Sequence, residues 1–561
     1  MEKVKSNFYI SHEGEDMKKF SNIIMILLIV SLAFVSCGKK TADQAPAAIA
    51  EPAKTETAGV ATDSGNVKSA EVKADVKYKD TVIIGVANDI TTLDPQGSNT
   101  DANMMAFYLT HERLVNVDPD TNEVIPGLAE SWTVSDDGCT YVFTLPADAT
   151  FTDGTKCTAE DVKYTYDKAK TSSFASQKVA DVKEVTVLDD THVQVVLAKA
   201  NQDWITLMAH GGMSIMSKAA CEKDAKTGPY LGTGMFALEE WKPGDYCSFV
   251  RYDGYRGAKA PTRRIVFKLF KEASTRLIAL QTGEIDVCID PSTTDLERIK
   301  EDSKLDLIQT PDVVLLYIPM QMEKKGLDNV HVRKALAYCA DKEAMVLAGK
   351  DGLGTVHNNY INRGQFGLNP DIHVYEFDVA KAKEELALSG YKPGQLTFHI
   401  MVDKEFKETM ALIFQANCAE AGINIAIDKM ETAALKGKLN DAALDYEMCI
   451  YQFTDDLGTD YTLRNQCGST LQANGTLKKN GSNRPNMKDA KFNEMIDKAL
   501  VETDSNKRKQ MYYEAENYLD EVCPLIPICT SYINIGAKKG LAGAIWKPDA
   551  KHDYRFIAIP E

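Results

Sequence analysis

Strands and helices alternate along the chain from residue 81 to its end, and this alternation limits the possible folds more than any other feature. The β-branched run at residues 81–87 predicts a buried strand. At 140–145, Tyr141, Phe143 and Leu145 alternate with Thr and Val, as a half-buried strand requires. Further strands are predicted at 192–197, 264–270 and 446–451, and helices at 159–170, 273–282, 331–347, 379–389, 407–421, 489–502 and 507–522. The chain is therefore predicted to be α/β, with no internal repeat.

Composition sets the size and the class of partner. The chain has 561 residues, of which 44% are hydrophobic and 26% charged, enough for two or three domains with a large core. Its formal net charge of -17 makes nucleic acid or an anionic lipid face a poor partner. We expect a soluble globular part that binds no nucleic acid.

The twelve cysteines show no metal-binding spacing. Apart from Cys37 they are scattered singly, and eleven is an odd number, so at least one thiol has no partner. We expect small buried hydrophobic residues rather than a disulfide framework. Cys523 and Cys529 are the one pair close enough in sequence to examine for a bond. No metal site is predicted.

The apolar run at 23–35 predicts export. It follows Lys18 and Lys19, ends at Ser36 and Cys37, and is shorter than the roughly 20 residues of a membrane span. Residues 1–36 are therefore predicted to be a signal peptide, with the true start at Met17. The cleavage region resembles the lipobox of bacterial lipoproteins, which implies a diacylated Cys37 and a membrane anchor on the periplasmic side or the outer surface. The alternative is ordinary secretion after a nearby small residue.

Residues 37–79 are predicted to be a flexible tether. The segment is rich in Ala, Lys, Glu and Thr and contains no aromatic residue before Tyr78. Such a composition buries too little apolar surface to offset the entropy of ordering. About 40 residues would reach roughly 35 Å, which holds a domain clear of a membrane.

Several motifs after residue 81 resemble one known family. They are the segment Pro-Gly-Leu-Ala-Glu-Ser-Trp at 126–132, Asp-Asp-Gly at 136–138, Phe-Thr-Asp-Gly at 151–154, Thr-Ala-Glu-Asp-Val at 158–162, Gly-Thr-Gly at 232–234, Leu-Gln-Thr-Gly-Glu-Ile-Asp at 280–286 and Val-Arg-Lys-Ala-Leu-Ala-Tyr at 332–338. In this order they closely resemble the signature of family 5 solute-binding proteins, the peptide-, dipeptide- and nickel-binding subunits of ABC importers.

The resemblance implies a two-lobed periplasmic-binding-protein-like fold, type II, in the large form with an extra subdomain. Lobe I is predicted at 80–312 with an inserted subdomain at about 122–235, lobe II at 313–525, and a return to lobe I at 526–561. Crossings between the lobes are expected at 312–322 and 524–532. The motifs themselves are mostly scaffold, with Trp132 packing the subdomain and Gly138 and Gly154 in hairpin turns.

The resemblance also suggests where a ligand is held. In peptide-binding relatives a Trp, two residues and an Asp lie where this chain has the segment 451–456, and the Asp pairs with the peptide's amino terminus. Here Tyr451 or Phe453 replaces the Trp, and either Asp455 or Asp456 would receive the amine. The alternative is a solvated loop acid.

Candidates for the other contacts are fewer. Dipeptide-binding relatives hold the carboxyl terminus with an Arg in the region matching 402–408, where this chain has only Lys404 and Lys407. Arg363 is another cation that could reach the ligand, or it could form a surface ion pair. In the loop after the first strand, Ser98, Asn99 and Thr100 could supply hydrogen bonds.

No catalytic constellation is visible: the sequence has no GxSxG, HExxH, P-loop or GxGxxG motif. We expect a lipid-anchored, monomeric binding protein without enzyme activity or cofactor, which captures oligopeptides and delivers them to an ABC transporter permease. The alternatives are a nickel or metal-chelate binder of the same family, a surface adhesin or chaperone on the same scaffold, and an enzyme whose residues converge from distant segments.

Overall fold

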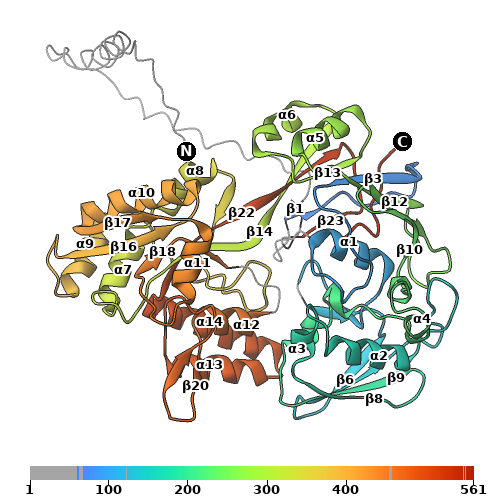
Figure 1. Cartoon of the computed structure of the whole chain (residues 1–561), viewed down its shortest axis with the longest axis horizontal. Helices are drawn as coiled ribbons and strands as arrows, with labels where there is room; N and C mark the ends of the chain where they lie inside the picture. The colour runs from blue at the N-terminus through green and yellow to red at the C-terminus, as the bar shows by residue number, and fades with distance from the viewer. Residues whose placement is uncertain (1–59, 62–66, 122, 454–457, 548, 550) are drawn as a thin grey trace, which may run out of the picture. The chain divides into compact units, whose positions relative to one another are not determined.

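A nine-stranded sheet is the largest sheet in the described part of the protein. We describe residues 60–61, 67–121, 123–453, 458–547, 549 and 551–561 of a computed structural model, all within the unit 57–561 (Figure 1). The strand order is β10-β11-β12-β3-β13-β22-β14-β19, and β15 also pairs with β22. The strands are β10 Phe236–Lys242, β11 Tyr246–Arg251, β12 Arg264–Leu269, β3 Thr81–Val86, β13 Val287–Ile289, β22 Leu525–Lys538, β14 Leu305–Pro319, β19 Tyr451–Phe453 and β15 Gly354–Val356.

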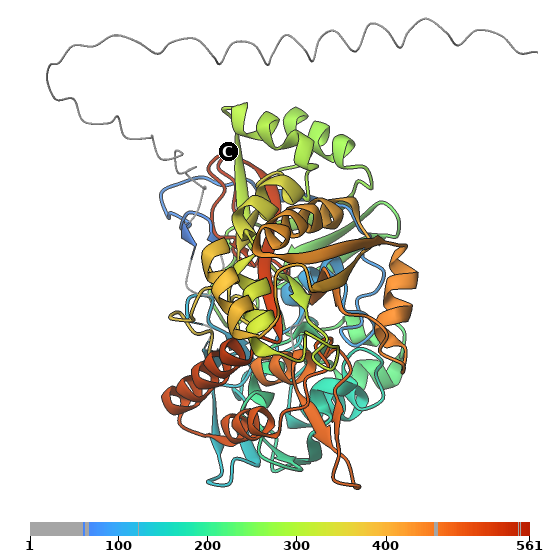
Figure 2. The same cartoon turned by 90° about the vertical axis from the view of Figure 1, so that its left-hand side faces the viewer.

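Two long strands, β14 and β22, connect the two lobes. They pair antiparallel almost from end to end, and Figures 1 and 2 show them side by side. Ile308 and Ile535 lie in the lobe I core, whereas Ile318 and Ile526 lie in a separate lobe II core. The pairing register shifts between Pro311 and Leu315, so the ladder is interrupted where the strands leave lobe I. The predicted two-lobed fold is confirmed.

Lobe I is built on the predicted first strand. β3 lies between β12 and β13 and runs parallel to both. Its side chains Val82, Ile84 and Val86 are buried, as expected for a strand in the middle of a sheet. The helices α1 Asp101–Thr110, α5 Ala273–Thr282 and α6 Leu296–Glu301 belong to this lobe.

The inserted segment has a four-stranded antiparallel sheet of its own, in the order β6-β7-β9-β8. The strands are β6 Ser131–Val134, β7 Thr140–Thr144, β8 Val182–Val187 and β9 His192–Leu197, and the helix α2 Ala159–Ala169 contacts β8 and β9. Thr158 and Asp161 form the predicted capping box at the start of α2. Trp204 packs on Tyr141 with ring centroids 4.8 Å apart. Trp132 is half-buried against this core, as predicted.

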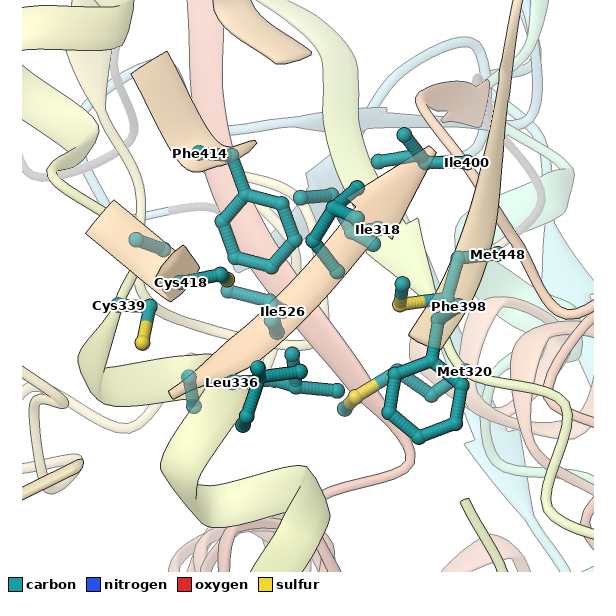
Figure 3. Packing of buried hydrophobic residues seen from close by; sticks show 14 of the residues in the cluster. Ile318, Met320, Leu336, Cys339, Phe398, Ile400, Phe414, Cys418, Met448 and Ile526 are labelled. Carbon is teal, nitrogen blue, oxygen red and sulfur yellow. The ribbon is translucent and has the colours of Figure 1, made fainter. Parts of the chain in front are cut away.

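Lobe II packs helices against the small parallel sheet β17-β16-β18, formed by β17 Ile423–Lys429, β16 Leu396–Val402 and β18 Met448–Cys449. Figure 3 shows the core, which contains Phe414 and Leu336 from helices together with Phe398 and Ile400 of the small sheet. The helices are α7 Val330–Tyr338, α8 Lys342–Lys350, α9 Val379–Leu388, α10 Glu405–Ala421, α11 Thr432–Asn440, α12 Thr459–Gln466, α13 Ala490–Val501 and α14 Ser505–Val522.

Two element predictions in lobe II are wrong. The single helix expected at 331–347 is two helices, because Asp341 accepts a hydrogen bond from the Ala344 amide and starts α8 after a break. The strand expected at 446–451 is divided at Ile450, because β18 pairs with β16 while β19 pairs with β14 in the large sheet. The other predicted helices and strands are confirmed to within about two residues at each end.

The remaining elements are short: β1 Val60–Ala61, β2 Val67–Lys68, β4 Val115–Val117, β5 Val124–Pro126, α3 Trp204–Leu207, α4 Lys218–Lys223, β20 Ser469–Leu471, β21 Leu477–Lys479 and β23 Ile545–Trp546. Among the described helices, none has the length and apolar character to cross a membrane. The cysteines from Cys139 to Cys529 are free thiols, and Cys523 and Cys529 are not bonded to each other. The predicted lobe boundaries stay a prediction.

Candidate functional site

The predicted ligand-binding residues fall on three described segments. Ser98, Asn99 and Thr100 precede α1, Tyr451 and Phe453 lie on β19, and Arg363 lies in the loop after β15. In the described part of the chain, these candidate residues form no hydrogen bond or ion pair with a candidate residue of another segment. Asp455, Asp456 and Cys37 lie outside the described residues.

The segment before α1 is held by its own hydrogen bonds. The buried Ser98 hydroxyl oxygen accepts a hydrogen bond from the Thr100 amide at 3.2 Å, and Ser98 also donates to the Thr100 hydroxyl at 3.3 Å. Asn99 and the N-cap residue Thr100 are exposed. Asn99 and Thr100 are thus accessible to a ligand, whereas Ser98 mainly shapes the turn.

The two aromatic candidates on β19 differ in burial. Phe453 is buried and pairs with Leu315 of β14, so it belongs to the lobe II interior. Tyr451 is half-buried, meets Tyr317 edge to face at 6.3 Å, and lies 5.3 Å from the guanidinium of Arg484. Tyr451 is the one of the two that retains surface for a ligand.

A buried carboxylate fixes the loop that carries Arg363. Glu516 of α14 has no exposed surface, and its oxygens accept hydrogen bonds from the amides of Tyr360 and Asn369, both at 2.9 Å. The Ile361 amide at 3.4 Å and the Asn359 side-chain amide at 3.2 Å complete the set. Burial raises the pKa of Glu516 to about 7, although all four hydrogen bonds favour the ionised form.

Arg363 is a cation without a carboxylate partner among the described residues. Its Nε atom is buried and has no hydrogen-bond partner. The ion pair that was the alternative prediction for this residue is not found in the described part of the chain. Burial, together with the charge of Arg363, lowers the pKa of nearby His357 to about 4, so the histidine stays neutral. A guanidinium on a fixed loop is suited to binding a carboxylate.

Helix α12 braces the same loop from the other side. Thr459 donates a short hydrogen bond to the Phe366 carbonyl, and Gln466 donates to the Tyr360 carbonyl at 3.1 Å. Gln365 donates to the Thr462 hydroxyl at 2.8 Å. The Arg363 loop is therefore held between α12 and α14.

The lysines that were compared with a relative's carboxylate-binding Arg are less suited to that task. Lys407 is buried and forms an ion pair with Asp403 at 2.7 Å. Lys404 is exposed at the start of α10. Of the three predicted cations, only Arg363 combines a fixed backbone with an uncompensated charge among the described residues.

Two carboxylates in lobe I were missed by the sequence analysis. Burial, together with the charges of Asp101 and Asp290, raises the pKa of Asp312 to about 6. Partial desolvation likewise raises the pKa of Asp290, an exposed residue just after β13. Asp312 accepts a hydrogen bond from the Val314 amide at 3.1 Å, at the register shift of β14. No local sequence pattern indicates these two acids, because they come close to each other only when the sheet has formed.

Two surface depressions of the described chain lie elsewhere. One of about 400 Å³ is lined by Asp328, Asn329 and residues 389–391 of lobe II. Another, of about 380 Å³, lies between α2 and β8 of the inserted segment. Both are shallow and contain none of the predicted residues. Within the described ranges, no group of three or more His, Cys, Asp or Glu side chains is arranged to hold a metal ion.

Comparison with known proteins identifies similar chains over most of this length. The family model described as bacterial extracellular solute-binding proteins, family 5 Middle, matches residues 123–475. The dipeptide-binding protein of Escherichia coli (strain K12) is 28% identical over 498 residues, which cover 82% of this chain and 91% of that protein. Heme-binding protein A of Haemophilus influenzae is 26% identical over 505 residues, covering 83% and 90%.

The fold of a solved structure agrees. The structure of HbpA2 from Haemophilus parasuis has a TM-score of 0.78 and 26% identity, and the similarity covers 86% of this chain and 100% of that one. The predicted resemblance is therefore confirmed at the level of sequence and of fold.

Proposed function

The chain belongs to the bacterial extracellular solute-binding proteins of family 5, and from this premise we propose that it binds oligopeptides between its lobes and delivers them to an ABC transporter permease. The observation that carries the proposal is the similarity to a dipeptide-binding protein over 91% of that protein's length. The family consists of binding proteins rather than enzymes, so no reaction is proposed. We expect the protein to act as a monomer.

In this proposal the peptide's carboxylate pairs with Arg363. The loop is held by Glu516 and α12, so little entropy is lost when the guanidinium binds. Tyr451 supplies an aromatic wall, and Asn99 and Thr100 supply hydrogen bonds from lobe I. Main-chain hydrogen bonds from such segments bind peptides with little side-chain preference.

Native mass spectrometry of protein purified without denaturation tests the class of ligand. We expect bound species with the masses of short peptides. A metal chelate or a porphyrin in place of peptides would contradict the proposal, as would a protein that is empty and does not bind a synthetic peptide mixture in calorimetry.

Removing the Arg363 charge should weaken peptide binding. We expect Arg363→Gln to raise the Kd for a captured peptide roughly 10- to 150-fold, because a charge-assisted hydrogen bond contributes about 1.5–3 kcal/mol. Calorimetry with free and carboxyl-amidated peptide measures the Kd. For the amidated peptide, the Kd of the variant should differ from that of wild type far less than for the free peptide. Lys404→Gln is the matched control, because it removes an exposed lysine charge. Equal affinities of wild type and Arg363→Gln for the free peptide would exclude the assignment.

For the amino terminus, the sequence resemblance leads us to propose Asp455 or Asp456. We expect only one of Asp455→Asn and Asp456→Asn to weaken binding, by about 1.5–3 kcal/mol. Acetylating the peptide's amine should cost wild type a similar amount, and the two changes should be far from additive because they remove one contact. If both variants bind free and acetylated peptides like wild type, the amine is held elsewhere.

We also propose that Cys37 carries a lipid anchor and that residues 37–79 tether the binding unit to a bacterial membrane. This follows from the apolar run at 23–35 and the small residue before Cys37. The chain would then act in the cell envelope, close to its permease.

A further inference from the structure

One side chain of the inserted segment reaches across to lobe II. Asp203 precedes α3, and its carboxylate accepts a hydrogen bond from the Asp460 amide of α12 at 3.0 Å. A second bond runs in parallel, from the Gln202 amide to the Leu500 carbonyl of α13 at 2.9 Å. Figure 1 shows α3 beside α12, away from the place where the paired strands β14 and β22 pass from one lobe to the other. Asp203 is only 7% exposed, so the contact excludes water.

The hydrogen bond replaces a missing cap. The N-cap residue of α12 is Gly458, which has no side chain to accept the first amides of its helix. Its backbone angles, φ 103° and ψ 171°, suit glycine, and an added Cβ would lie 3.2 Å from the Asp203 carboxylate. Asp203 occupies the N-cap position of α3 but makes no side-chain bond to that helix. The carboxylate therefore serves α12 instead of its own helix.

The contact is held rigidly on the subdomain side. Trp204, the next residue, is 1% exposed and packs against Tyr141 in the subdomain core. On the lobe II side the Asp460 carboxylate is engaged by Arg464 at 2.7 Å, so only its amide is offered to Asp203. Burial raises the pKa of the Asp203 carboxyl, and the charge of Arg508 opposes this.

We propose that Asp203 is a latch between the inserted subdomain and lobe II, which holds the lobes together by capping α12 from the opposite side. A buried hydrogen bond to a carboxylate is stronger than one between neutral groups, so the latch biases the balance between open and closed lobes. Because α12 also braces the Arg363 loop, the latch couples closure to the position of that guanidinium. This last step rests on the proposed function; the latch itself does not.

Hydrogen exchange and small-angle scattering of the ligand-free mature chain test the latch. In Asp203→Ala the amides of 459–463 should exchange at least about tenfold faster, because the cap is lost. The Gln202 amide should also exchange faster and the radius of gyration should increase, which a purely local cap would not cause. Asp203→Asn should fall between wild type and Asp203→Ala, because an Asn side-chain oxygen still accepts the amide hydrogen bond but lacks the charge of the carboxylate. Asp190→Asn, an exposed acid on the same subdomain, is the charge control.

The outcomes separate clearly. Faster exchange confined to 459–463, with an unchanged radius, would overturn the latch and leave only a cap. No change in either measurement would overturn both. Because every measurement is made without peptide, a failure of peptide binding leaves this result intact. Urea unfolding of the three variants identifies any that fails to fold. If Asp203→Ala fails to fold, Asp203→Asn carries the test, because protonation of Asp203 at low pH should increase the radius of gyration of wild type but not that of this variant. Equal dependence of the two radii on pH would count against the latch.

Discussion

Replacing Glu516 by Ala is expected to lower the free energy of unfolding by about 3 kcal/mol or more. Four donors, from Asn359, Tyr360, Ile361 and Asn369, would lose their acceptor at a fully buried position. Each buried donor left unsatisfied costs about 1–3 kcal/mol, and partial relaxation of the loop recovers some of this. Urea unfolding of wild type and variant measures the difference.

The pH dependence identifies the carboxyl itself. The pKa of Glu516 is raised from 4.5 to about 7, so the favourable contribution of its protonated form is complete below pH 4.5 and is lost as the pH rises through about 7. Glu516→Gln cannot ionise, so its stability relative to wild type should improve as the pH rises from about 4.5 to about 7. Glu514→Gln, which changes an exposed side chain on the same helix, is the matched control. A constant difference between Glu516→Gln and wild type would mean that the carboxyl does not titrate in this range.

Replacing Cys37 by Ala is expected to move the protein from the membrane to the soluble fraction. Each buried CH₂ of an acyl chain contributes about 0.8 kcal/mol, and more than one chain is needed for stable attachment, so losing the acylated residue changes partitioning by orders of magnitude. Fractionation of cells with an antibody to the folded unit measures it. Ser36→Ala keeps a small residue before the cysteine and should stay with the membrane. Membrane retention of Cys37→Ala would refute the anchor.

Local sequence determined much of the fold. β9, α5 and the α2 capping box were predicted because hydrophobic period and capping residues act within a few positions. The break between α7 and α8 was missed because the apolar period continues across it, although Asp341 is a good cap for a new helix. The division at Ile450 depends on which sheet each half joins, and no local pattern contains that choice.

The candidate site was less predictable for the same reason. Arg363 was predicted either to reach the ligand or to form a surface ion pair, but the residue that fixes its loop is Glu516, about 150 residues later in the chain. The Asp203 contact joins residues 257 positions apart. Such partners meet only after the lobes have formed, so periodicity, spacing and capping rules cannot indicate them. Asp312 is marked by its neighbours in space, Asp101 and Asp290, and not by its own surroundings in sequence.

The free cysteines determine when an exported chain can be oxidised. Thiols such as Cys339 and Cys418 are fully buried in the lobe II core, and burial holds the pKa of Cys418 well above its usual range (Figure 3). A thiol that stays protonated and out of reach of solvent is inert to oxidants. These buried thiols are open to oxidants only while the chain emerges unfolded, so folding competes with oxidation in time. In an oxidising compartment the speed of folding then decides how many chains keep these buried thiols reduced, and in the folded molecule these thiols need no repair by thiol reductants.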